Sequence, residues 1–181
     1  MTRYVALLRG INVGGHRVKM TDLKSYFEQL GLEEVETFIA SGNVVFRSRT
    51  KEAALVTLIE QHLAKALGYE VPTFIRTPAD LAAIAAFAPF EEPFGSDNVG
   101  TLSIMFFAAQ LDQNTEARLP TYNTRVDKLR SHGREIYWLS LGRTSDSEVD
   151  WVKLGKELKL PPTTVRNVTT IRKLAAKYPQ Q

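Results

Sequence analysis

The order of strand-like and helix-like patterns in the first 76 residues constrains the fold more than any other feature of the chain. Four apolar runs have the composition of strands, and they occupy residues 3–8, 34–48 (two runs around Ser41 and Gly42) and 69–76. Two segments carry apolar residues at helical spacing, and they cover residues 21–30 and 50–67. The order is therefore βαββαβ, which predicts an α+β fold with a ferredoxin-like N-terminal half.

The second half of the chain shows a similar but less complete order. Residues 100–110 are apolar on both faces of a strand, a short helix follows, and a hairpin turns at His132 and Gly133. Two helical segments, 149–158 and 165–178, end the chain. This order predicts a smaller α+β half of the form β-α-β-β-α without a clear last strand, and a degenerate duplication of the first half is an interpretation that stays open.

The stretch of residues 88–100 is rich in proline, glycine and polar residues and suggests a linker. We therefore place a domain boundary there, which gives a ferredoxin-like domain at 1–88 and a second α+β domain with a closing amphipathic helix at 89–181.

Composition excludes several classes of protein. The chain of 181 residues has no cysteine, so it can form neither disulfides nor thiolate metal sites, and its three histidines show no spacing typical of metal ligands. We therefore expect no metal, and no particular cofactor is indicated. The opening residues lack the features of a signal peptide and no run is long enough to span a membrane, so we expect a cytoplasmic protein without a membrane partner. A net charge of +3 is far from that of a dedicated nucleic-acid binder.

The stretch RGINVGGHRVK, residues 9–19, follows the first predicted strand and lacks both familiar nucleotide-binding motifs. Glycines let backbone N–H groups approach an anion, and cationic side chains strengthen such contacts. We therefore predict an anion-binding loop, with contributions from Arg9, Asn12, Gly14, Gly15, Arg17 and Lys19. The structural alternative is a tight strand-to-helix connection that needs positive φ angles.

A second stretch, ASGNVVF at residues 40–46, starts the third predicted strand. In a βαββαβ sheet the first and third strands are antiparallel neighbours at the centre, so Asn43 should lie close to Arg9. Ser41 and Asn43 are thus further candidates for the anion site. Ordinary hairpin turn chemistry explains the same residues equally well.

A third stretch, TTVRNVTTIRKL at residues 163–174, is predicted to start a helix. Arg166 in the first turn would oppose the helix dipole, so an anion there would be stabilising. Arg166 and Asn167 therefore join the candidate site. An internal ion pair with Glu148, Asp150 or Glu157 is the alternative.

These three stretches together resemble the bacterial domain-of-unknown-function family DUF1697. RGINVGG, ASGNVVF and a C-terminal Thr-x-Arg-Asn segment are the hallmarks of that family, and the resemblance covers nearly the whole chain. One departure is Val168, where the family pattern usually has tryptophan. The resemblance implies an α+β fold with a ferredoxin-like half and implies no established activity.

The leading functional hypothesis is a pocket for a phosphorylated or otherwise anionic small molecule. Its predicted lining residues are Arg9, Asn12, Gly14, Gly15, Arg17, Ser41, Asn43, Arg166 and Asn167. Whether catalysis follows binding is left open by the sequence. Two alternatives remain, a nucleic-acid binder that uses the same basic loop and a non-catalytic interaction module, either monomeric or a homodimer formed through the edge strand that contains Pro72.

Overall fold

The computed structural model of the chain describes residues 1–12, 14–39, 42–90 and 100–180. The chain divides into two compact units. Unit 1 consists of Met1–Ile84 together with the C-terminal segment from Lys173, and unit 2 of Ala85–Arg172. The predicted linker lies mostly outside the described residues. The division into two domains after residue 88 stays a prediction.

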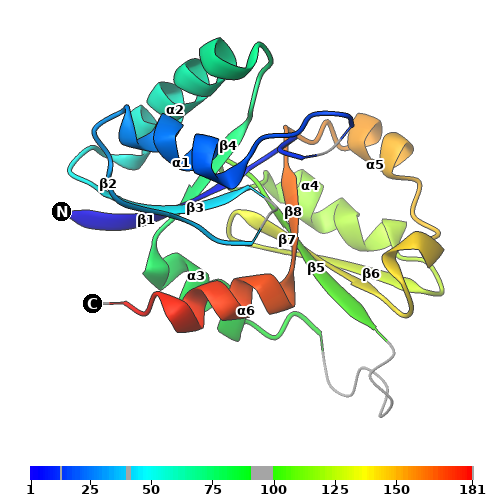
Figure 1. Cartoon of the computed structure of the whole chain (residues 1–181). Helices are drawn as coiled ribbons and strands as arrows, with labels where there is room; N and C mark the ends of the chain where they lie inside the picture. The colour runs from blue at the N-terminus through cyan, green and yellow to red at the C-terminus, as the bar shows by residue number, and fades with distance from the viewer. Residues whose placement is uncertain (13, 40–41, 91–99, 181) are drawn as a thin grey trace. The chain divides into compact units, whose positions relative to one another are not determined.

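Unit 1 contains a four-stranded antiparallel sheet, as expected for a βαββαβ order. Its elements are β1 (Thr2–Leu8), α1 (Met20–Glu28), β2 (Glu33–Thr37), β3 (Asn43–Ser48), α2 (Glu52–Leu67), β4 (Thr73–Arg76) and α3 (Pro78–Ala86). The sheet order is β2-β3-β1-β4, so β1 and β3 lie at the centre as predicted (Figure 1). Leu7 is opposite Asn43 in the register of these two strands, and the end of β1 therefore lies beside the start of β3.

The main core of unit 1 lies between this sheet and the helices α1 and α2, which cover one of its faces (Figure 1). Alternate residues of β1 enter this core, and α2 contributes residues spaced by one helical turn, namely Leu55, Ile59 and Leu63. Burying one such leucine or isoleucine stabilises the fold by roughly 1.5 to 3 kcal/mol. On the other face of the sheet Val5 and Leu7 are also fully buried. From Tyr4 to Leu8, both faces of β1 are therefore buried, whereas Thr2 and Arg3 at its start are at least partly exposed.

The edge strand β2 is irregular at Glu34. Its pairing with β3 shifts register between Glu33 and Glu36, and Glu34 has a φ of 49°. A bulge of this kind re-aims the side chain of the extra residue. The C-terminal segment is attached to the same strand, because the Tyr178 hydroxyl (2.5 Å) and Lys177 Nζ (2.9 Å) both donate to Glu36 Oε2.

Unit 2 repeats the βαββαβ order. Its helices and strands are β5 (Thr101–Phe106), α4 (Gln113–Arg118), β6 (Asp127–His132), β7 (Glu135–Ser140), α5 (Trp151–Glu157) and β8 (Thr164–Asn167). The helix α6 (Val168–Lys177) begins in unit 2 and continues into unit 1 from Lys173 onward. Two short 3-10 helices, Leu119–Tyr122 and Thr144–Asp146, are added in its loops. The sheet is antiparallel with the order β6-β7-β5-β8, so the predicted central position of β5 is confirmed. The order matches that of the first sheet strand for strand, in agreement with the duplication interpretation.

The prediction of a helix start at residues 163–165 was wrong. Residues 164–167 form β8, the last strand that the sequence pattern did not reveal, and α6 begins only at Val168. A four-residue strand is too short to show a clear alternation, and its last residue, Asn167, starts the helix by accepting a hydrogen bond from the Thr169 N–H (2.8 Å). The short strand was therefore not recognised, because the strong helical periodicity of the residues after it dominates the pattern of this segment.

A buried carboxylate organises the loops of unit 2. Asp127 is fully buried and accepts hydrogen bonds from Trp138 Nε1 (2.7 Å), Thr124 Oγ1 (2.8 Å) and the Glu148 N–H (2.8 Å). Burial works to raise the pKa of Asp127, but the donors outweigh it and the pKa is lowered. The carboxylate thereby joins β6, β7 and the segment before α5.

Among the described residues, no helix is long and apolar enough to cross a membrane.

Candidate functional site

The predicted anion-binding loop joins β1 to α1 and has an unusual backbone. Gly10, Asn12, Gly14 and Gly15 all have φ angles between 59° and 90°. Asparagine is one of the few residues with a side chain that tolerates this region, because it can hydrogen-bond locally. Here Asn12 Oδ1 accepts a hydrogen bond of 2.7 Å from the Val18 N–H, six residues later. The Asn12 side chain therefore closes the loop on itself.

The turn between β2 and β3 packs directly against this loop. The Leu8 N–H donates to the carbonyl oxygen of Gly42 at 2.8 Å. Gly42 has a φ of 75°, and a Cβ atom at this position would lie 3.2 Å from the Cβ atoms of both Leu8 and Ile11. Only glycine fits this close approach without a shift of the neighbouring side chains. Ser41 lies outside the described residues.

Asn43 lies at the start of β3, as predicted, and its side chain is buried. Its Nδ2 donates to the carbonyl oxygen of Phe38 at 2.9 Å, while the Phe38 N–H donates to the Asn43 carbonyl oxygen at 2.9 Å. Since Asn43 has no exposed surface, these contacts support a positioning role at the base of the β2–β3 turn. Contact between Asn43 and a ligand stays a prediction.

A third segment, the connection between α2 and β4, completes the arrangement and was missed in the sequence. The Arg9 N–H donates to the carbonyl oxygen of Pro72 at 2.9 Å. The His16 ring stacks on the Tyr69 ring with 3.9 Å between centroids and 29° between planes. Burial raises the pKa of Tyr69. No short motif in the sequence marks Tyr69 or Pro72, because both contacts depend on the pairing of β4 beside β1.

We call the described residues of 9–19, 42–43 and 69–72 the loop cluster. It carries exposed cationic groups at Arg9, Arg17 and Lys19, and one exposed acidic residue, Glu70. No acidic residue occurs in the sequence between Arg9 and Asp22. Gly14 and Gly15 are exposed as well. The cluster thus presents a net positive charge and exposed glycines on a loop that is held by its own Asn12–Val18 hydrogen bond and by two neighbouring segments.

Arg166 and Asn167 belong to unit 2, on β8. Arg166 is 7% exposed, and its Nη1 donates to Thr164 Oγ1 and to the Val165 carbonyl oxygen, both at 2.8 Å. Burial lowers its pKa to about 10. Because Arg166 lies in a strand, the argument from an unfavourable position in a first helical turn does not apply. Asn167 is used in starting α6.

A second buried arginine was not identified from the sequence. Arg76 ends β4, is 1% exposed, and donates from Nη1 to the Ile75 carbonyl oxygen at 2.8 Å. The sequence pattern offered no cue for it, because the correspondence of Arg76 with Arg166, each on the fourth strand of a βαββαβ unit, depends on β8, which the pattern did not reveal. Among the described residues, no three or more His, Asp or Glu side chains are grouped as metal ligands would be.

The sequence pattern of the family described as a protein of unknown function (DUF1697) matches residues 1–137, which include both the RGINVGG loop and the ASGNVVF strand. The chain belongs to this family. The match ends before β8, so the Thr-x-Arg-Asn segment lies outside it.

Among solved structures, this DUF1697 chain is similar to a conserved bacterial protein from Streptococcus pneumoniae. The two share 28% sequence identity with a TM-score of 0.76, and the similarity covers 99% of each chain. No curated protein matches the sequence. The family and the fold are thus defined, and the structural neighbour, known as a conserved bacterial protein, brings no activity with it.

Proposed function

We propose that the loop cluster binds the phosphate group of a small molecule. The observation that carries this proposal is the fixation of one cationic, glycine-rich loop by two other segments, through the Leu8–Gly42 and Arg9–Pro72 hydrogen bonds and the His16–Tyr69 stack. A site that is held in place before the ligand arrives loses less conformational entropy on binding. This fixation of the loop supports the proposal of a binding site.

The cationic side chains supply the binding energy in this proposal. Arg9 and Arg17 present guanidinium groups, which match phosphate oxygens in a bidentate geometry, and Lys19 adds a point charge. A charge-assisted hydrogen bond contributes about 1.5 to 3 kcal/mol. Loss of one arginine is therefore expected to weaken phosphate binding by at least about tenfold.

The other predicted residues have supporting roles in this proposal. Asn12 sets the shape of the loop through Val18, and Asn43 holds the β2–β3 turn through Phe38. Gly14 and Gly15 offer exposed backbone N–H groups to the phosphate. Arg166 and Asn167 are already engaged within β8 and α6, so the proposal rests on unit 1 alone. It concerns binding, and no reaction is assigned to the loop cluster.

A small molecule is favoured over a nucleic acid by the burial of the sheet. Single-stranded RNA is commonly bound by bases that stack on an exposed sheet face. In β1, however, residues on both faces are buried, including Val5, Ala6 and Leu7. A nucleic acid could therefore contact only the loop, without a stacking surface on this sheet.

Titration calorimetry tests the proposal with inorganic phosphate, glycerol phosphate, adenosine monophosphate and a short RNA. We expect binding of the small phosphates to the native protein and a loss of about tenfold or more in Arg9→Ala and in Arg17→Ala. Arg49→Ala is the matched control, because Arg49 is also exposed but follows β3 outside the loop cluster. Unchanged phosphate affinity in both loop variants would overturn the proposal. Tight RNA binding that falls steeply with salt, without binding of the small phosphates, would favour the nucleic-acid alternative.

A further inference from the structure

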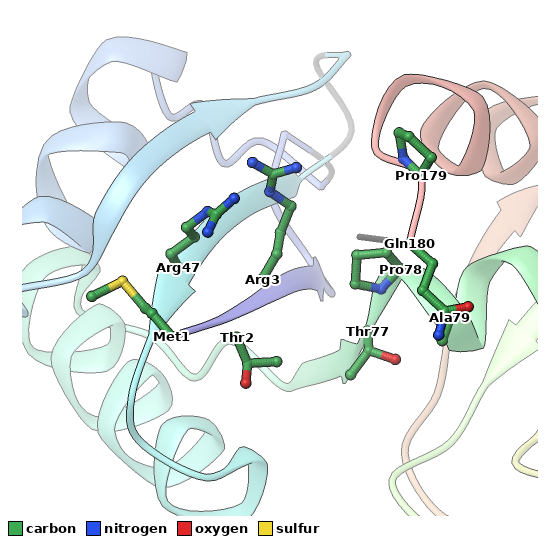
Figure 2. Close-up of a pocket in the computed structure, with 9 residues that line it drawn as sticks. All are labelled: Met1, Thr2, Arg3, Arg47, Thr77, Pro78, Ala79, Pro179 and Gln180. Carbon is green, nitrogen blue, oxygen red and sulfur yellow. The ribbon is translucent and has the colours of Figure 1, made fainter.

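A separate pocket of about 370 Å³ lies in unit 1 beside the first residues of β1. It is lined by Met1, Thr2, Arg3, Arg47, Thr77, Pro78, Ala79, Pro179 and Gln180. Figure 2 shows Arg3 and Arg47 on neighbouring strands, with Pro179 and Gln180 from the C-terminal segment across from them. Its volume falls in the range of small-molecule pockets. None of its lining residues belongs to the loop cluster.

The two arginines are directly opposite each other in the register of β1 and β3. Like charges in this position repel, so the pair needs an anionic group nearby. In the structure this group is the Glu34 carboxylate, whose Oε2 is 3.1 Å from Arg3 Nη2 and 2.9 Å from Arg47 Nε. The arginines are therefore already arranged to hold a carboxylate.

Glu34 is the most exposed member of this charged group. Its side chain is 58% exposed, whereas those of Arg3 and Arg47 are each only 21% exposed. It also comes from the bulge of β2 with a φ of 49°, a backbone conformation that is unfavourable for glutamate. Glu34 does not line the pocket, so a ligand would reach the guanidinium groups from a different side.

The rest of the pocket determines the kind of ligand. Pro78, Ala79 and Pro179 form an apolar wall across from the arginines, and the Met1 side chain lies beside Arg47 (Figure 2). At the start of α3, Asp80 already accepts hydrogen bonds from the Thr77 N–H (2.8 Å) and Oγ1 (2.9 Å), so the anionic group of a ligand is assigned to the arginines and not to this helix end. We propose that the pocket binds a small organic carboxylate with an apolar body, held between Arg3 and Arg47 in exchange with Glu34.

The probe for this proposal is benzoate, with benzamide as its uncharged analogue and inorganic phosphate as the competing anion. The sequence is used without added tags at either end, because Met1 and Gln180 line the pocket. Binding is followed by NMR through the side-chain Nε–H resonances of Arg3 and Arg47 at constant ionic strength. We expect benzoate, but not benzamide, to shift both resonances.

Variants separate this pocket from a general effect of charge. Arg3→Gln and Arg47→Gln are expected to weaken benzoate binding by about tenfold or more, while Arg49→Gln leaves it unchanged. Ala79→Leu fills the apolar wall without altering any charge and should also weaken binding. Glu34→Gln should tighten binding, because it removes the internal competitor.

Three results would overturn the proposal. These are an absence of binding at any accessible benzoate concentration, equal binding of benzamide, and phosphate binding in place of benzoate. Weaker binding in Glu34→Gln would contradict the exchange with Glu34. Arg9→Ala should leave benzoate binding intact, so failure of the phosphate proposal and failure of this one are distinguishable.

Discussion

Arg76 and Arg166 occupy matching positions in the two βαββαβ units. Each lies on the fourth strand, opposite Val5 of β1 or Ile104 of β5, the first strand of its unit. Each is nearly buried and donates from Nη1 to the carbonyl oxygen of the preceding residue at 2.8 Å. The two arginines thus match in the strand they occupy, in the strand they pair with and in the hydrogen bond they donate. This match supports the interpretation that the two halves of the chain repeat one structural unit.

We predict that Arg76→Ala and Arg166→Ala destabilise the protein by similar amounts, about 2 to 4 kcal/mol each, because each leaves a cavity and a buried carbonyl group with one donor fewer. Urea unfolding followed by circular dichroism measures both. A large loss in one variant with none in the other would show that the two arginines are not equivalent.

Gly42→Ala should be more destabilising than Gly14→Ala. Both residues have positive φ angles, but only at Gly42 does the new Cβ approach other atoms closely, at 3.2 Å from Leu8 and Ile11. We expect a loss of about 1 kcal/mol from backbone strain at Gly14 and about 1 to 3 kcal/mol more at Gly42 from the clash. Thermal unfolding of the two variants gives the comparison, and equal losses would contradict the close packing of the β2–β3 turn on the loop.

Tyr69→Phe should leave stability unchanged or raise it by up to about 1 kcal/mol. The Tyr69 hydroxyl is buried and has no hydrogen-bond partner among the described residues, so its removal abolishes a desolvation penalty. The stack with His16 is retained by phenylalanine. A clear loss of stability on chemical unfolding would instead reveal a partner of the hydroxyl.

The attachment of the C-terminal segment should weaken in acid. Hydrogen bonds from Tyr178 and Lys177 lower the pKa of Glu36 below its usual value of 4.5. A carboxyl group whose pKa is lower in the folded state stabilises that state above its unfolded pKa, and this contribution is lost as the pH falls through the folded pKa. We expect the Tyr178 resonances to shift as the pH falls below about 4.5, and Glu36→Gln to remove this dependence. A titration unchanged by Glu36→Gln would refute the assignment.

The parts of the fold that could be predicted from sequence are those with long periodic signals. The pairing of β1 with β3 followed from the order of elements, and it correctly placed Asn43 beside the end of β1. Strand β8 was missed because four residues carry too little periodicity. The same error led to the interpretation of Arg166 as a residue of a first helical turn.

The candidate site was only partly visible in the sequence, for a similar reason. RGINVGG and ASGN are local motifs and can be recognised without a structure. The contacts of Arg9 with Pro72 and of His16 with Tyr69 join residues more than 50 positions apart, and neither partner stands out in its own segment. The Arg3–Glu34–Arg47 group depends on strand register and on a bulge, which sequence patterns define poorly.

The sharpest test of phosphate binding by the loop cluster is Asn12→Asp. Aspartate keeps the oxygen that accepts the Val18 N–H and tolerates a φ of 59°, so the loop should keep its shape while gaining a negative charge. Calorimetric titration with inorganic phosphate should show affinity reduced by about tenfold or more in Asn12→Asp, with thermal stability close to that of the native protein. Equal phosphate affinity in the two proteins, or no phosphate binding by the native protein, would contradict a phosphate site at this loop.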